Sequence, residues 1–175
     1  MIHLVIGGAR SGKSNYAEKL AQKSSQPITY IATATAGDDE MKKRIAYHQQ
    51  DRPKEWMLIE EPFYLSDHIN LLKNQFVLID CLTLWLSNWL CTYDVEAFAQ
   101  EKDSFINALL NSKSSITLVT NEVGSGIVPM GELSRDFVDQ AGWLNQAIAS
   151  VADKVTLVVA GCPLSLKTQK QDQFI

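Results

Sequence analysis

The residue types most suited to chemistry gather near the start of the chain. There an apolar segment (2–6) runs into a stretch of the form G-x-x-x-x-G-K-S and then a helical pattern, which is the context that a nucleotide phosphate-binding loop requires. Glycines let the backbone close around a phosphate, and its N–H groups, with the positive end of the next helix, attract the anion. A plain glycine turn would not explain Lys13 and Ser14, which suit the terminal phosphates and Mg²⁺ respectively. We therefore predict that nucleotide phosphates bind to Gly7, Gly8, Ala9, Arg10, Ser11, Gly12, Lys13 and Ser14.

A carboxylate stands at the end of a second apolar segment. Residues 76–80 read Phe-Val-Leu-Ile-Asp, which is typical of a strand buried on both faces. In phosphate-loop enzymes a carboxylate at this place orients Mg²⁺ or its water ligands. Asp80 could instead only cap the next helix, but the phosphate loop favours the metal role. Ser14 and Asp80 are therefore the predicted Mg²⁺ ligands.

One histidine stands between two arginines at helical spacing. Arg44 and His48 are four residues apart and would share a helix face, and Arg52 follows four residues further on. Nearby positive charges disfavour the protonated imidazole, and a neutral imidazole can attack phosphorus while arginines hold the phosphate oxygens. The spacing by itself nevertheless favours an ordinary histidine on a solvated basic face.

A loop with two glycines and a proline, residues 121–129, follows the apolar segment 116–120. Glycine and proline suggest a fixed loop shape, and its place predicts that it borders a ligand. Glu122 could be a base, a group near a metal or a solvent-exposed acid, and the residues alone leave these alternatives open.

The elements that must position these residues alternate between strands and helices. This alternation predicts an α/β fold, a mostly parallel sheet with helices on both faces, in which ligands bind at the carboxyl ends of the strands. Segment 82–90 is apolar nearly all round, so its helix is expected in the core or in a subunit interface. We predict one domain over 1–175, with a frayed tail at 167–175. The expected strands are 2–6, 28–32, 56–59, 76–80, 116–120 and 155–160, and the expected helices are 15–23, 38–50, 63–72, 82–93, 95–110 and 131–152.

Composition excludes several classes of function. The chain has 175 residues, 46% of them hydrophobic, and a net charge of −4, so nothing overall favours a nucleic-acid partner. Apolar runs are too short for a signal peptide or a membrane span. The three cysteines have no metal-ligand spacing and fit small buried side chains in a reducing cytoplasm.

Together these motifs resemble the bifunctional adenosylcobinamide kinase / adenosylcobinamide-phosphate guanylyltransferase family of cobalamin biosynthesis. The resemblance covers nearly the whole chain and is far more specific than the phosphate loop alone. The matching segments are 7–14, 30–33, 38–41, 44–45, 48–49, 52–53, Trp56, 60–62, 80–88, 121–129, 145–146 and 160–164.

The resemblance implies a RecA-like P-loop fold, a homotrimer and two reactions. The family phosphorylates the aminopropanol arm of adenosylcobinamide with ATP or GTP, and then transfers GMP from GTP onto that phosphate, releasing pyrophosphate. The second reaction passes through a guanylylated histidine, and His48 lies at that position. Arg44, Asn121 and Glu122 are expected to position substrate or phosphate. The expected nucleotide-binding residues beyond the phosphate loop are Thr33, Ala34, Thr35, Gln49, Gln50, Asp51, Arg52, Asp80 and a carboxylate at Glu60 or Glu61, which position alone does not separate.

Three competing functions remain to be weighed. A GTPase switch is disfavoured because no Asn-Lys-x-Asp motif follows segment 116–120. The acidic balance of the chain speaks against a RecA-like nucleic-acid motor. A small-molecule kinase without the guanylyl transfer, with His48 merely on the surface, is the closest alternative.

Overall fold

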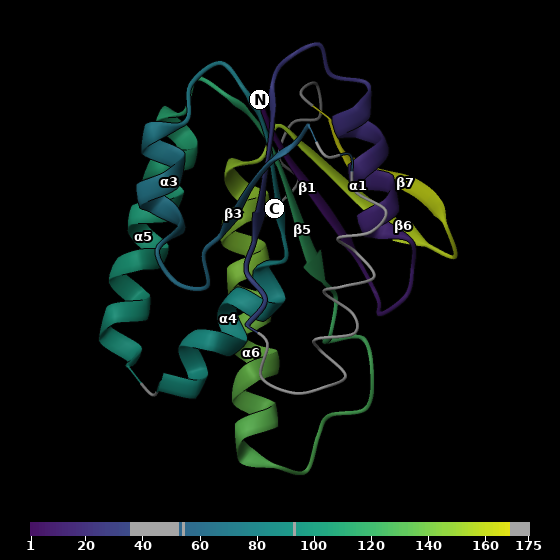
Figure 1. The fold of residues 1–175 in the computed structure, drawn as a ribbon. Coiled ribbons are helices and arrows are strands. Elements are labelled where there is room, and N and C mark those ends of the chain that lie inside the picture. The colour runs from purple at the N-terminus through teal and green to yellow at the C-terminus, as the bar shows by residue number, and fades with distance from the viewer. Residues whose placement is uncertain (36–52, 54, 93, 169–175) are drawn as a thin grey trace.

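The computed structural model describes residues 1–35, 53, 55–92 and 94–168. A seven-stranded sheet in the order β3-β2-β4-β5-β1-β6-β7 runs through the molecule (Figure 1). Its strands are parallel except for β7, which runs antiparallel to β6. The strands are β1 (Ile2–Gly7), β2 (Ile28–Ala32), β3 (Met57–Glu60), β4 (Phe76–Asp80), β5 (Ser115–Asn121), β6 (Lys154–Val159) and β7 (Cys162–Lys167).

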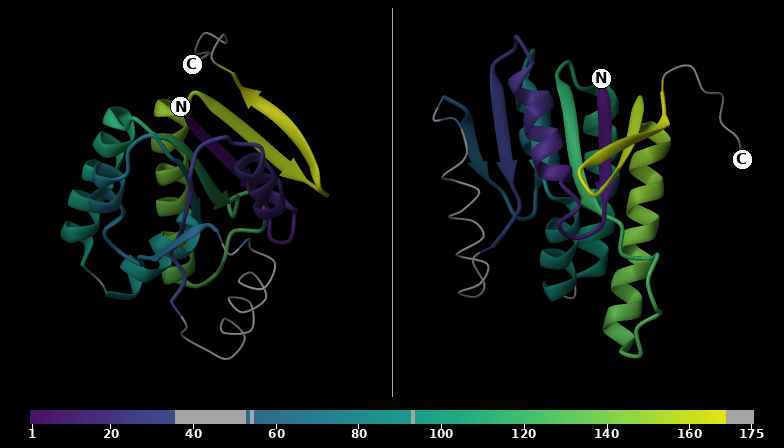
Figure 2. Two further views of the ribbon diagram at one scale, coloured as in Figure 1. Left: turned by 45° about the horizontal axis from the view of Figure 1, so that its top comes forward. Right: turned by 90° about the vertical axis from the view of Figure 1, so that its right-hand side faces the viewer.

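Helices cover both faces of this sheet (Figure 2). The larger cluster of buried side chains joins the sheet to α3, α4, α5 and α6, and the smaller one joins its other face to α1. The apolar strands are buried on both sides for this reason, as parallel strands usually are. The helices are α1 (Lys13–Gln22), α3 (Leu65–Leu71), α4 (Leu82–Thr92), α5 (Val95–Asn111) and α6 (Glu132–Val151).

The apolar helix α4 belongs to the core. Trp85 is fully buried, and its ring lies 5.5 Å from that of Phe98 and 5.3 Å from that of Phe105, centroid to centroid. Trp89 is buried beside it and contacts Phe63. This helix was expected either in the core or in a subunit interface, and its two tryptophans lie in the core.

The expected elements agree with the observed ones, with one omission. The bounds of β2 and β4 are those predicted. For the other expected elements within the described residues, no end differs from the prediction by more than two residues. The expected helix 38–50 lies outside the described residues. The prediction missed β7, an edge strand that contains Pro163, a residue that edge strands tolerate. Lys167, which was expected to begin a frayed tail, lies within β7, and its Nζ donates to the carbonyl oxygens of Ala149 and Ser150. Residues 169–175 of the expected tail lie outside the described residues.

At the amino ends of β1, β5 and β6, away from the phosphate loop, a hollow of about 520 Å³ with polar and apolar lining residues lies between α1 and β7. His3, Thr117 and Thr156 line it where strands covered by a helix would carry apolar residues. His3 Nε2 lies 2.8 Å from Thr156 Oγ1, and the imidazole is buried. Burial, reinforced by the charge of Lys154, lowers the pKa of His3 to about 4.

This histidine makes folding stability depend on pH. The folded protein keeps His3 neutral down to about pH 4, whereas the unfolded chain protonates it near pH 6.5. Acid therefore favours the unfolded chain, and stability should fall as pH drops from 6.5 towards 4, by about 2 kcal/mol at pH 5 from this residue. Urea unfolding at pH 7 and pH 5 measures the loss.

The matched variant is His3→Gln, which keeps a polar side chain but does not titrate. Its stability should change about 2 kcal/mol less than that of the wild type between pH 7 and pH 5. Equal changes in the two proteins would show that His3 is not the group responsible.

Candidate active site

The phosphate loop joins the end of β1 to the start of α1. Gly12 has a φ of 93°, a left-handed conformation that favours glycine, and it begins the helix. Lys13 is only 8% exposed, and its Nζ lies 3.0 Å from the carbonyl oxygen of Gly8. The Lys13 ammonium group is thus held against the loop that would surround a phosphate.

Close packing fixes the loop from behind. A Cβ on Gly7 would lie 2.4 Å from the carbonyl oxygen of Val158 and 2.6 Å from Ser11 Oγ, so only glycine fits there. The N–H of Gly161 donates to the carbonyl oxygen of Ser11 over 2.8 Å. The turn between β6 and β7, which the sequence analysis left out of the site, therefore supports the phosphate loop.

The end of β4 is separated from this loop by β5 and is tied to the residue that follows β2. Thr33 Oγ1 donates to the carbonyl oxygen of Cys81 and accepts from the N–H of the same residue, over 2.7 and 2.9 Å. Burial, reinforced by the charge of Asp80, raises the pKa of the Cys81 thiol to about 12, although the charge of Lys13 acts in the opposite direction. Asp80 and Lys13 therefore both lie within electrostatic reach of one thiol, and that thiol stays protonated.

A single amide on α4 holds the loops that follow β2 and β3. Asn88 Nδ2 donates to the carbonyl oxygens of Thr33, at 2.7 Å, and Pro62, at 3.1 Å. Its Oδ1 accepts from Thr35 Oγ1 over 3.2 Å. Asn88 thereby brings two of the expected nucleotide-binding segments, 33–35 and 60–61, next to each other.

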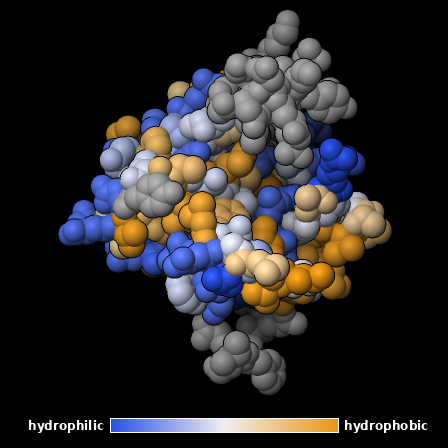
Figure 3. Space-filling view, turned by 90° about the horizontal axis from the view of Figure 1, so that it is seen from below, coloured by the Kyte–Doolittle hydropathy of each residue, from blue (hydrophilic) through white to orange (hydrophobic). Residues whose placement is uncertain are grey.

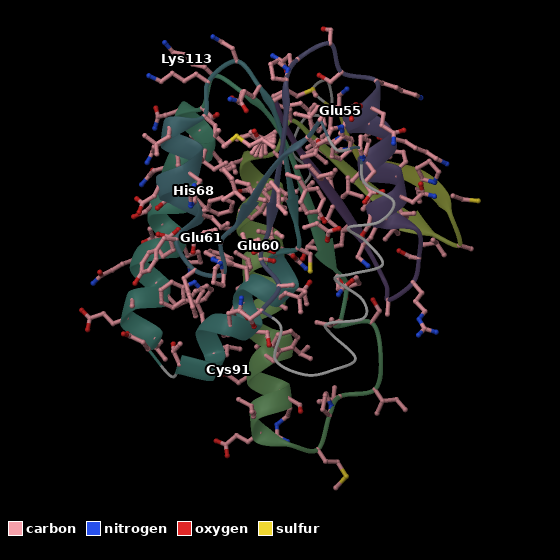
Figure 4. The ribbon with its side chains drawn as sticks, viewed as in Figure 1. Glu55, Glu60, Glu61, His68, Cys91 and Lys113 are labelled. Atoms are coloured by element: carbon pink, nitrogen blue, oxygen red, sulfur yellow. The ribbon has the colours of Figure 1, made fainter. Side chains whose placement is uncertain are left out.

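The structure separates the two neighbouring glutamates. Glu61 accepts from the N–H groups of Phe63 and Tyr64, over 2.8 and 2.9 Å, and from His68 Nε2 over 3.2 Å. Burial acts to raise the pKa of Glu61, but these hydrogen bonds and His68 outweigh it and lower the pKa. Figure 4 shows Glu61 and His68 close to α3, whereas Glu60 lies nearer the middle of the molecule. Glu60 is exposed, ends β3 and is opposite Ala32 in register, so it is the carboxylate better placed for a ligand.

The end of β5 lies between the phosphate loop and Asp80, because β5 pairs with both β1 and β4. Asn121 is opposite Gly7 in register, and the N–H of Glu122 donates to the carbonyl oxygen of Gly7 over 3.0 Å. The Glu122 carboxylate accepts from the N–H of Gly124 over 2.7 Å, so it shapes its own loop. Figure 3 views the molecule from the side of these strand ends, where hydrophobic and hydrophilic side chains both reach the surface.

Comparison with known proteins identifies this arrangement. The family model described as cobinamide kinase / cobinamide phosphate guanyltransferase matches residues 3–166. The chain belongs to this family. The resemblance noted in the sequence is therefore confirmed.

Relatives match over nearly their whole length. The bifunctional adenosylcobalamin biosynthesis protein CobP of Pseudomonas aeruginosa is 48% identical over 169 residues, which cover 95% of this chain and 98% of the relative. The protein CobU of Escherichia coli, described in the same words, is 42% identical and is covered completely. Among solved structures, the RadB recombinase superposes with a TM-score of 0.53 at 15% identity, over 89% of this chain and 73% of that one. This likeness, with the strand order, confirms the expected RecA-like P-loop fold.

Six residues that the cobinamide kinase / guanyltransferase resemblance places in the site lie outside the described residues. They are Arg44, His48, Gln49, Gln50, Asp51 and Arg52. Of the expected site residues that the structure describes, Gly7–Ser14, Thr33–Thr35, Glu60, Asp80 and Asn121 lie at the carboxyl ends of the strands, along one edge of the sheet.

Mg²⁺ fits the residues present. Ser14 and Asp80 offer hard oxygen donors, at the start of α1 and the end of β4. Within the described ranges no three His, Cys, Asp or Glu side chains gather as for a metal held by protein alone. A phosphate-loop site needs fewer protein ligands, because phosphates and water fill the other positions. In the same part of the chain, none of the helices is long and apolar enough to cross a bilayer.

Sequence reasoning missed the side chains that hold the site together. Asn88 and Asn145 were noticed only as parts of matching segments, and Thr83 and Thr120 received no role. Each bonds to backbone or side-chain atoms between 24 and 55 residues away. Such long-range partners leave no local pattern in a sequence.

Proposed function

We propose that this chain phosphorylates the aminopropanol hydroxyl of adenosylcobinamide, using ATP or GTP, and then transfers GMP from GTP to the new phosphate. The products of the second step are adenosyl-GDP-cobinamide and pyrophosphate. The observation that carries the proposal is the match of the family model to residues 3–166, on a chain whose phosphate loop is closed as nucleotide binding requires.

In both steps the described residues bind and orient phosphates. The loop N–H groups and Lys13 stabilise negative charge as it builds on the transferring group. Ser14 and Asp80 would hold Mg²⁺, which supplies further charge neutralisation when bound. Phosphoryl transfer depends mainly on such positioning, so a prominent side-chain base is not required.

In the second step His48 is the proposed nucleophile. Its neutral imidazole forms a bond to the α-phosphorus of GTP, and the bond from that phosphorus to pyrophosphate breaks. A phosphate oxygen of the cobinamide phosphate then takes the GMP, and the histidine leaves. Arg44 and Arg52 are proposed to hold phosphate oxygens and to keep His48 unprotonated.

The remaining assignments follow the same family match. Thr33, Ala34, Thr35, Gln49, Gln50, Asp51 and Glu60 are proposed to contact the nucleotide, and Asn121 and Glu122 to place the substrate phosphate. We also propose a homotrimer in the cytoplasm. Ile127, Val128 and Met130 are strongly exposed beside the site, which supports a contact with a further subunit there.

A product analysis tests the function. The purified chain is incubated with adenosylcobinamide, ATP, GTP and Mg²⁺. The corrinoids are then separated by chromatography and identified by mass spectrometry. We expect first the phosphate ester and then its GMP adduct. Accumulation of the phosphate ester alone, with GTP present, would favour the plain kinase.

The assignment of Glu60 yields a paired prediction. Glu60→Gln should raise the KM for GTP about 10- to 100-fold, since a hydrogen bond to a charged carboxylate contributes roughly 1.5–3 kcal/mol. Glu61→Gln should lower the melting temperature, because it weakens the turn before α3, and leave the KM within about threefold. Initial-rate kinetics and thermal unfolding of both variants measure the two effects. The opposite pattern would assign the ligand to Glu61.

A further inference from the structure

A closed ring of hydrogen bonds surrounds the backbone of Asn121. The N–H of Asn121 donates to Thr83 Oγ1 over 2.7 Å, and its carbonyl oxygen accepts from Asn145 Nδ2 over 3.2 Å. Thr120 Oγ1 donates to Asn145 Oδ1 over 2.9 Å. The Thr83 and Thr120 hydroxyl oxygens lie 3.4 Å apart, which completes the ring. One residue from α4 and one from α6 therefore fix the last residue of β5.

Asn145 is the least expected member of this ring. It is only 8% exposed, and the other buried residues of α6 are Ala141, Leu144 and Ile148. A buried amide is costly unless its donor and acceptor are both used, and here both are used by the end of one strand. Packing alone would be served as well by a leucine, so the amide points to a role at the strand end.

That strand end borders the phosphate loop. Asn121 is opposite Gly7 in register, and Glu122 N–H donates to the carbonyl oxygen of Gly7. The side-chain Oδ1 of Asn121 is buried and has no hydrogen-bond partner among the described residues. The ring thus holds the backbone of a residue whose own side chain keeps an unused acceptor at the edge of the site.

We propose that Asn145 is a positioning residue for both transfer reactions. It acts through Asn121, which it holds beside the phosphate loop, and it does not itself touch the nucleotide. This inference rests on the proposed function, because it concerns the rate of the transfers that the site performs.

The first variant, Asn145→Leu, replaces the amide by an apolar side chain of similar size and removes the hydrogen bonds that Asn145 contributes to the ring. We expect kcat for phosphoryl and guanylyl transfer to fall about 10- to 100-fold, with the KM for GTP within about threefold, because misplacement by a fraction of an ångström acts on the transition state. The matched control is Ile148→Val, on the same buried face of α6 but outside the ring. It should lower the melting temperature and leave kcat unchanged.

The second variant, Asn145→Asp, gives a pH dependence of kcat that a loss of packing alone would not produce. Its carboxylate can still accept from Thr120, but only the protonated form can donate to the carbonyl oxygen of Asn121. The kcat of the variant, divided by that of the wild type, should therefore rise at least about threefold from pH 8 to pH 6 as the buried carboxyl takes up a proton.

The results separate the possible failures. If folded Asn145→Leu has the wild-type kcat, or loses activity only in proportion to its unfolding, the positioning role is overturned. A pH-independent ratio for Asn145→Asp also contradicts it. If the wild type itself performs neither transfer, the proposed function fails instead.

Discussion

Replacing Lys13 by alanine should abolish both transfer reactions. Lys13 Nζ is held 3.0 Å from the carbonyl oxygen of Gly8 in the phosphate loop, where a phosphate of the nucleotide would meet it. Loss of one preorganised charge from such a site costs about 10²–10³ in kcat, and the nucleotide loses affinity as well. We therefore expect kcat/KM for the kinase and the guanylyl transfer to fall about a thousandfold. Initial rates with saturating adenosylcobinamide or its phosphate measure the change.

Two further variants show whether the charge is responsible. Lys13→Met keeps most of the buried aliphatic stem and should be as inactive as Lys13→Ala while unfolding at a temperature closer to that of the wild type. Lys19→Ala removes an exposed lysine from the last turn of the same helix and should retain full rates. Full activity of Lys13→Ala would remove the phosphate loop from the mechanism.

Replacing His48 by alanine should separate the two reactions. If His48 only carries GMP, Lys13 and the phosphate loop remain able to transfer a phosphoryl group. Kinase turnover should stay within about threefold of the wild type, while guanylyl transfer falls below about one hundredth, since no covalent intermediate forms. The adenosylcobinamide phosphate should therefore accumulate, which chromatography of the corrinoids measures directly.

The control for this prediction is another histidine. His68 lies in α3, is bonded to Glu61 and has no proposed role in either transfer, so His68→Gln should retain both reactions. Equal loss of kinase and guanylyl transfer in His48→Ala would instead indicate that the residue supports the nucleotide site as a whole.

Local patterns were sufficient to predict six of the seven strands that the structure describes, and the loop that joins β1 to α1. Apolar runs such as 28–32 and 76–80 have few alternatives to buried strands, and their bounds were correct. The loop was predictable because glycine, lysine and serine each have a physical task at a fixed spacing. The match to the family then reduced the many possible functions of a nucleotide-binding site to two particular reactions.

Contacts between distant residues could not be predicted in the same way. Asn88 bonds to Thr33 across 55 positions, and Asn145 bonds to Asn121 across 24. Glu61 differs from Glu60 only through hydrogen bonds to the turn that follows it. The edge strand β7 was missed because its side chains are mostly exposed, and its residues lack the unbroken apolar run by which the buried strands were found.

The central claim is that His48 carries GMP between GTP and the corrinoid. The most direct measurement is covalent labelling with GTP radioactive at the α-phosphate, followed by addition of adenosylcobinamide phosphate. We expect the wild type to take up label that withstands denaturation, to lose it to the added corrinoid, and to take up none from GTP labelled at the γ-phosphate. His48→Ala should take up no label from either nucleotide. Labelling of His48→Ala equal to that of the wild type, or a wild-type label that the corrinoid does not remove, would contradict the account.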